Sequence, residues 1–205
     1  MQLTDDQNDA LTEVVNIGVG KAAAALSQLM GERICLSVPR IIVCDPDELS
    51  RNLDASPEQL DTSVVQDFNG DVSGRAVLAF PRSSGVKLGQ VLAGLNETSD
   101  ELDLDLADTL EEVGNIVLNG VLGSISNLLA SGLIYSVPRL HADTDVRHLL
   151  TDHPTDKQHT SRTRLMANTQ FDVASRSISG SLLIVFNLGS IETIIEAALG
   201  QTTLQ

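Results

Sequence analysis

The chain has 205 residues, enough to bury a hydrophobic core without disulfides or a structural metal. Its 28 acidic and 13 basic residues give a net charge of −15, and acids outnumber bases in both halves. This excess argues against nucleic acid or an anionic membrane as the main partner, and the 2% aromatic content argues against a base-stacking surface. The two cysteines and the lack of a signal peptide favour the reducing cytoplasm.

The first predicted element is a helix that starts at Thr4, where Thr4 and Gln7 fit a capping box, and ends near residue 30 before Gly31. A strand over 34–44, a polar loop over 45–57, a hairpin with strands over 63–68 and 74–80, and a helix over 85–95 follow. The second half repeats this order: a helix from a Thr98–Glu101 capping box to about residue 130, a strand over 133–142, a polar loop over 143–159, strands over 164–173 and 179–186, and a helix over 190–199.

The second half also repeats particular residues of the first half. The Ser-Val-Pro-Arg sequence at 37–40 recurs 99 residues later, and the match resumes at an offset of 106, which predicts about seven extra residues within 143–159. We therefore expect one domain, 1–205, built from two repeats, 1–97 and 98–205. The predicted class is α+β: duplicated αβββα units with pseudo-two-fold symmetry, forming two three-stranded antiparallel sheets with the long helices on one face.

One uncharged stretch, 113–138, is longer than a membrane span requires. It contains several Asn and Ser residues and four glycines, and the matching segment of the first half carries Lys21, Glu32 and Arg33. We therefore expect a buried helix followed by a strand here, and no membrane segment.

A polar stripe marks both long helices. In each copy, Asp, Glu and Asn follow at i, i+4 and i+7, which places them within about 60° on one helix edge. Such stripes are most often solvated helix faces, and acids near a helix start also favour its dipole. Recurrence of the same three residues points instead to a function, because a solvated face tolerates most polar residues and Asn is a poor mid-helix residue. The stripes are Asp9, Glu13 and Asn16, and Asp108, Glu112 and Asn115.

In both copies a proline follows the Asn after 22 residues, at Pro39 and Pro138. The full pattern resembles that of the CheC-type chemotaxis phosphatase family, which includes CheC, CheX and FliY, over almost the whole chain. Two intact motifs resemble CheC most. We expect a structural role for both prolines, because Pro ends or edges a strand.

The resemblance implies a cytoplasmic phosphatase that hydrolyses the aspartyl phosphate of a CheY-type response regulator. It assigns orientation of the attacking water to Asn16 and Asn115, since an amide can donate and accept hydrogen bonds without titrating. It assigns docking of the lysine of the receiver domain to Glu13 and Glu112. The receiver would supply Mg²⁺, so no cofactor is expected on this chain. The alternative is an adaptor that binds a CheD-type receptor deamidase and has weak phosphatase activity.

The remaining polar features carry less weight. Asp9 and Asp108 are expected to make supporting contacts. The acids within 100–112 fit either helix-start chemistry or tuning of docking at the second site. No metal site is expected, because the histidines in or beside the second polar loop lack ligand partners and are expected to be solvated. These histidines are His141, His148, His153 and His159.

Overall fold

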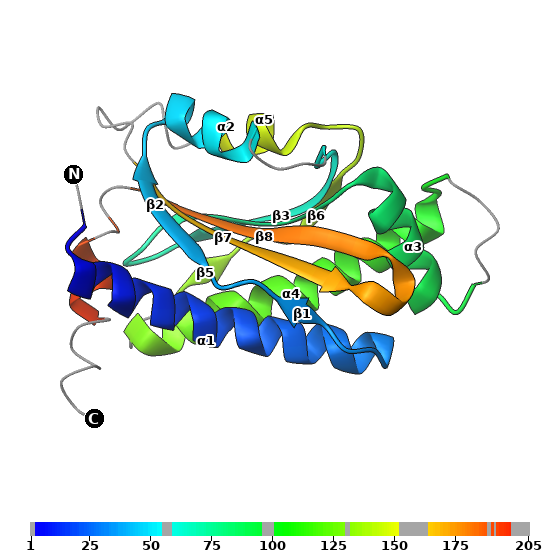
Figure 1. Cartoon of the computed structure of the whole chain (residues 1–205), viewed down its shortest axis with the longest axis horizontal. Coiled ribbons are helices and arrows are strands. Elements are labelled where there is room, and N and C mark those ends of the chain that lie inside the picture. The colour runs from blue at the N-terminus through cyan, green and yellow to red at the C-terminus, as the bar shows by residue number, and fades with distance from the viewer. Residues whose placement is uncertain are drawn as a thin grey trace.

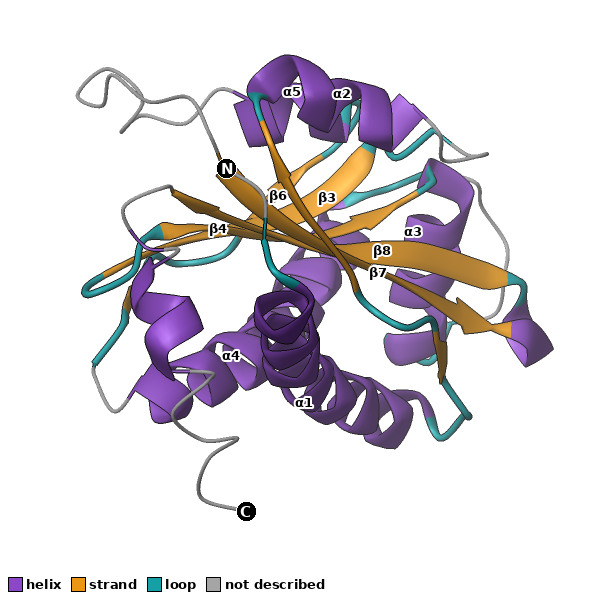
Figure 2. Cartoon of the chain, turned by 60° about the vertical axis from the view of Figure 1, so that its left-hand side comes forward, coloured by secondary structure: helices purple, strands orange, loops and turns teal. Residues whose placement is uncertain are grey.

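A computed structural model describes residues 3–54, 59–95, 101–129, 132–151, 164–187, 190 and 192–197. Within these residues one eight-stranded sheet lies between two layers of helices (Figure 1 and Figure 2). The helices are α1 Asp5–Met30, α2 Pro46–Asp54, α3 Arg82–Leu92, α4 Leu104–Leu129 and α5 Val146–Thr151, and residues 192–197 are also helical. The strands are β1 Cys35–Leu36, β2 Arg40–Cys44, β3 Thr62–Asn69, β4 Gly74–Phe80, β5 Ile134–Tyr135, β6 Arg139–His141, β7 Arg164–Val173 and β8 Ile178–Asn187, with the short 3₁₀ helix η2 Ala174–Arg176 before β8.

The predicted α+β class with antiparallel pairing is confirmed, but the prediction of two separate sheets is wrong. Strands β4 and β8 pair with each other, which gives the order β1–β7–β8–β4–β3–β5, with β2 also on β7 and β6 also on β3. Every residue of β4 is buried, and β8 is buried along nearly its whole length. A strand buried in this way needs a hydrogen-bonded neighbour at both edges, so the two hairpins join at the centre.

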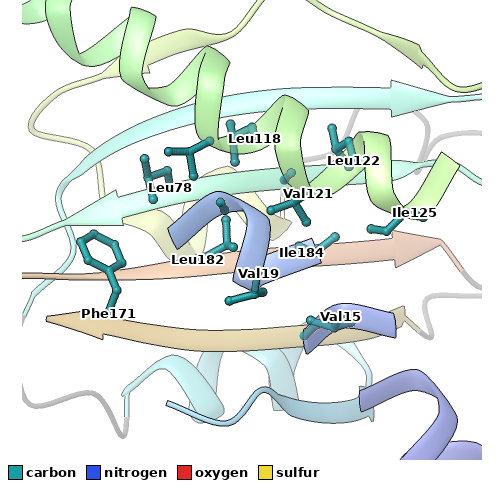
Figure 3. Packing of buried hydrophobic residues seen from close by; sticks show 14 of the residues in the cluster. Val15, Val19, Leu78, Leu118, Val121, Leu122, Ile125, Phe171, Leu182 and Ile184 are labelled. Carbon is teal, nitrogen blue, oxygen red and sulfur yellow. The ribbon is translucent and has the colours of Figure 1, made fainter. Parts of the chain in front are cut away.

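The long helices α1 and α4 cover one face of the sheet, as predicted, and pack against each other. Their apolar sides meet buried residues of β4, β7 and β8 (Figure 3). A Cβ added to Gly18 of α1 would lie 3.3 Å from Val121 of α4, so the two helices touch closely at this point. The core residues labelled in Figure 3 are Val15, Val19, Leu78, Leu118, Val121, Leu122, Ile125, Phe171, Leu182 and Ile184.

The opposite face is covered by α2 and α5 (Figure 2), which lie in segments predicted as polar loops. The loop prediction is therefore wrong for 46–54 and 146–151. Each helix inserts two buried aliphatic side chains, Leu49 and Leu53 from α2 and Val146 and Leu150 from α5. Two or three aliphatic residues in a helix of six to nine residues give too little periodicity to stand out in the sequence. The remaining positions 55–57 and 152–159 lie outside the described residues.

Each outer edge of the sheet contains the same bulge. Residues 37–39 lie opposite two residues of β7, and residues 136–138 lie opposite two residues of β3, so the predicted strands 34–44 and 133–142 are each interrupted. A serine fills the gap in the ladder: the N–H of Asp67 donates to Ser136 Oγ at 2.9 Å, and the N–H of Gln170 donates to Ser37 Oγ at 2.9 Å. The repeated Ser-Val-Pro-Arg sequence thus forms one local structure twice.

The strand registers show where the extra residues of the second half lie. Phe68 pairs with Gly74 and Phe171 pairs with Gly180, so the second hairpin is three residues longer at its turn. The other four extra residues lie between Pro138 and Phe171, and the prediction that all seven lie within 143–159 is wrong. The division into repeats 1–97 and 98–205 stays a prediction.

The helix ends follow local capping chemistry. Thr4 and Gln7 form the predicted capping box of α1, and Gly31 ends this helix with φ 65°. At α4 the Leu106 N–H donates to Asp103 Oδ1 at 2.9 Å, so this helix starts later than predicted, and Thr98 lies outside the described residues. In the described ranges, no helix combines the length and hydropathy that a membrane crossing requires.

Candidate functional site

The second polar stripe lines an open groove between α4 and the β3–β6 edge of the sheet. The groove has a volume of about 570 Å³. Strand β3 from the first half of the chain meets α4 and the second bulge here, because α4 crosses the sheet edge beside the bulge. The walls are formed by Gln66, Asp108, Glu111, Glu112, Asn115, Asn119, Tyr135, Ser136, Val137 and Pro138.

Helix α4 holds the stripe at the groove because its apolar side is fixed on the sheet. Leu110, Val113 and Val117 are buried, and Gly114 lies directly over Val64 of β3. Asp108 and Glu112 consequently remain exposed on the other side, and Asn115 is half-buried at the boundary. The carboxylates and the amide are therefore presented toward solvent from one rigid helix.

A chain of side-chain amides continues from Asn115 into the sheet. Asn119, one turn further along α4, donates from Nδ2 to Asn115 Oδ1 at 2.7 Å. Gln66 of β3 donates from Nε2 to Asn119 Oδ1 at 3.0 Å and to the backbone carbonyl of Ser136 at 3.0 Å. Asn115 is thus connected to the bulge through two buried or half-buried side chains.

The same wall has a second tie between helix and strand. Glu111 accepts a hydrogen bond from the backbone N–H of Leu140 in β6, with 2.7 Å between Oε1 and N. This contact fixes α4 to the outermost strand. It also adds a third carboxylate to the groove, beside Asp108 and Glu112.

The first stripe lies at the opposite edge of the sheet, because α1 packs beside β2 and β2 pairs with β7. Asp9, Glu13 and Asn16 are all exposed, as the stripe geometry predicts. The structure brings the first stripe and the second stripe to two separate surfaces, so they do not form one joint site.

Pro39 and Pro138 end the two bulges and are both buried. The valines before them are turned outward, with Val38 77% exposed and Val137 78% exposed. Pro138 lies in the wall of the same groove as Asn115, although 22 residues separate them in sequence. The structural role expected for the two prolines stays a prediction.

Comparisons with known proteins find a family model and two relatives that are similar to this chain. A profile of the CheC-like family matches residues 7–43, which contain the first stripe and Pro39. The CheY-P phosphatase CheC of Bacillus subtilis (strain 168) is 29% identical over 145 residues, covering 69% of this chain and 68% of that protein. The flagellar motor switch phosphatase FliY of the same strain is 23% identical over 143 residues, covering 67% of this chain and 36% of FliY.

A solved structure extends the likeness to the fold. Thermotoga maritima FliY superposes with a TM-score of 0.75 at 18% identity, covering 98% of this chain and 99% of the solved chain. The chain is similar to CheC-like proteins in sequence and to FliY in fold. The sequence profile, the two relatives and the shared fold together support the CheC-type family.

Two groove residues, Gln66 and Asn119, were not predicted from the sequence, and Glu111 was considered only as one of the acids within 100–112. Gln66 is a polar residue inside an otherwise apolar strand, and that contrast was a usable signal. Asn119 and Glu111 have no counterpart in the first copy, where the matching positions are Gly20 and Thr12. Because recurrence was the criterion for choosing residues, it could not find them.

The charged side chains in the described lining of the groove are all carboxylates. His141, on the strand beside the groove, has its pKa lowered from 6.5 by burial, and Arg75 and Arg139 lower it further. His148 lies exposed on α5, while His153 and His159 lie outside the described residues. Among the described residues, no three His, Cys, Asp or Glu side chains are grouped to hold a metal ion.

Proposed function

We propose that this chain is a phosphatase acting on the aspartyl phosphate of a CheY-type response regulator in chemotaxis. The observation that carries the proposal is the groove in which Glu112 and Asn115 stand together on one rigid helix beside a sheet bulge. The similarity to the CheY-P phosphatase CheC supports the same activity. The first stripe offers the same residue types on a second surface.

The shape and charge of the groove fit a protein substrate. It is open to solvent and lined by three carboxylates, so a free phosphate ester would be repelled. A phosphoryl group that arrives with a divalent cation and a lysine of its own is not repelled in this way. A phosphorylated receiver domain has that composition, so we assign Mg²⁺ to the receiver and no cofactor to this chain.

Different roles follow from the chemistry of the two side chains. Asn115 and Asn16 orient the attacking water in line with the phosphoryl group, which is catalysis by positioning and needs no general base. Glu112 and Glu13 accept the receiver lysine, since a carboxylate forms a charge-assisted hydrogen bond with an ammonium group. The acids one turn earlier, at 9 and 108, support the docking.

The test follows loss of label from a ³²P-phosphorylated receiver in a single turnover. We expect the full chain to accelerate the loss above the rate of the receiver alone, with the rate saturating as the chain is added in excess. The proposal would be contradicted if the chain accelerated dephosphorylation of no chemotaxis receiver from the same organism. If the chain showed no such acceleration but bound a receptor deamidase, we would assign it an adaptor function in place of the phosphatase activity.

The proposal also predicts where the chain works. A substrate in the signalling pathway between receptors and the flagellar motor places it in the cytoplasm. Fractionation of cells that express the tagged full chain should recover it with cytoplasmic proteins. Recovery from the membrane fraction without receptors would argue against this location.

A further inference from the structure

We infer that Gln66 and Asn119 are positioning residues for Asn115, and that they make the second site the faster of the two. This inference rests on the proposed phosphatase activity. It adds a difference between the two sites that their identical stripes do not reveal. The difference originates at a backbone carbonyl, whose hydrogen-bonding direction is fixed.

The orientation of three amides follows from the carbonyl of Ser136. This oxygen only accepts, so the amide of Gln66 must turn its NH₂ toward it, with 3.0 Å between N and O. The second N–H of the same group points at Asn119 Oδ1, also at 3.0 Å. Gln66 is 1% exposed and packed inside the sheet, so its amide cannot turn over without breaking both bonds.

The direction set by Gln66 passes on to Asn115. Because Asn119 accepts with its oxygen, its NH₂ faces Asn115 and donates to Oδ1 at 2.7 Å. The NH₂ of Asn115 is therefore turned away from Asn119. Its oxygen keeps a second lone pair for a water molecule. A side-chain amide that could otherwise turn by 180° is held in one orientation.

The first site lacks this arrangement. The residue four positions after Asn16 is Gly20, which has no side chain to donate. The strand residue opposite the first bulge is Thr169, whose Oγ1 is buried with no hydrogen-bond partner in the described part of the chain. Asn16 is exposed, whereas Asn115 is half-buried. The amide of Asn16 thus samples orientations that do not place water.

Restricting an amide to its productive orientation acts on the chemical step. One neutral hydrogen bond corresponds to about 0.5–1.5 kcal/mol, or about 2- to 12-fold in rate. We therefore expect the second site to have a kcat about 2- to 12-fold above that of the first. The KM values should differ less, because both sites keep the docking glutamate.

The experiment uses full-length chains with one working site each. Asn16→Ala leaves only the second site, and Asn115→Ala leaves only the first. Adding Asn119→Ala to the Asn16→Ala chain should lower kcat about 2- to 12-fold with KM nearly unchanged. Asn127→Ala is the matched control, since Asn127 is exposed on the same helix and does not line the groove. Its kcat should not change.

A gain of function provides the reciprocal arm. Gly20 has open space beside it, because nothing lies within 4 Å of a Cβ added at this position. Gly20→Asn in the Asn115→Ala chain should raise kcat of the first site, because the new amide would stand one turn from Asn16. Gly123→Asn, in equally open space on α4, is the control for the effect of a new Asn on helix stability.

A measurement that does not depend on activity distinguishes the positioning role of Asn119 from the proposed phosphatase activity. The ¹⁵N side-chain amide of Asn115 should show restricted motion in the free protein, and Asn119→Ala should release it. Equal kcat at both sites, or no effect of Asn119→Ala on kcat and on Asn115 motion, would overturn the inference while leaving the phosphatase intact. No phosphate loss at either site would overturn the proposed function and, with it, the inference.

Discussion

Gly114 is the point at which the catalytic proposal depends most on packing. A Cβ added there would lie 2.3 Å from Val64 Cγ1 and 2.7 Å from Val64 Cβ, well inside van der Waals contact. Val64 is completely buried in β3 and cannot move away. We therefore expect Gly114→Ala to push α4 off the sheet.

The expected magnitude combines two opposing effects. Replacing a helical glycine with alanine favours the helix by about 1 kcal/mol, while overpacking a core costs about 1–3 kcal/mol. The net change should lower the free energy of unfolding by up to about 2 kcal/mol. For a chain of this size, each kcal/mol corresponds to about 2–4 °C in Tm.

Gly123 of the same helix is the matched control. Nothing lies within 4 Å of a Cβ added at this position, so only the helix effect remains. Gly123→Ala should raise the free energy of unfolding by about 0.5–1 kcal/mol. Urea unfolding followed by circular dichroism measures both variants, and they should shift in opposite directions.

Gly114→Ala should also affect activity, because Gly114 lies between Glu112 and Asn115 on α4. In a chain carrying Asn16→Ala, Gly114→Ala should reduce phosphate loss from the receiver about 10²-fold, the effect of misplacing a positioning residue by about 1 Å. Adding Val64→Ala removes the closest methyl contact and should recover part of the lost stability, seen as a coupling in a double-mutant cycle. If Gly114→Ala stabilised the protein as much as Gly123→Ala, the contact between α4 and β3 would be wrong.

Three further predictions concern docking, thiol reactivity and pH. In the Asn16→Ala chain, Glu112→Gln should raise KM about 3- to 10-fold at low salt while leaving kcat within about 2-fold, because only a charge pair is lost; a change confined to kcat would refute the docking role. Iodoacetamide at about pH 8 should modify exposed Cys35 and spare Cys44, since burial raises the pKa of Cys44 to about 11; equal labelling in the native protein, measured by mass spectrometry, would show that Cys44 is not buried. The pKa of His141 is lowered from 6.5, so the stability that neutral His141 contributes is present above pH 6.5 and is lost as the pH falls through the folded-state pKa. His141→Gln should therefore flatten the pH dependence of the free energy of unfolding measured in urea. An unchanged pH dependence in this variant would contradict the prediction.

The sequence predicted those parts of the fold that depend on local chemistry. The start of α1 follows from a capping box between Thr4 and Gln7, and its end from a glycine with positive φ at Gly31. The hairpin of β3 and β4 was predicted in the same way, although its connection spans residues 69–73 and is longer than a two-residue turn. These features need only neighbouring residues, so a single sequence contains them.

The parts that were missed depend on contacts between distant segments. The pairing of β4 with β8 joins residues about 106 positions apart, and the apolar sequence of either strand does not specify which strand it pairs with. Helices α2 and α5 are stabilised by packing their few aliphatic side chains against the sheet face that they cover. The stripes themselves were found because they recur, whereas the hydrogen bonds from Gln66 through Asn119 occur in one copy only.

The central claim is that Asn16 and Asn115 place the attacking water without holding the substrate. The most direct measurement compares single-turnover dephosphorylation of a receiver with binding of the same receiver in its beryllofluoride-activated form. The chain carrying Asn16→Ala and Asn115→Ala should show no acceleration and should bind the receiver within about 3-fold of the unsubstituted chain. A control with Asn8→Ala and Asn127→Ala, exposed residues on the same helices, should keep full activity. Full activity of the Asn16→Ala, Asn115→Ala chain would contradict the account.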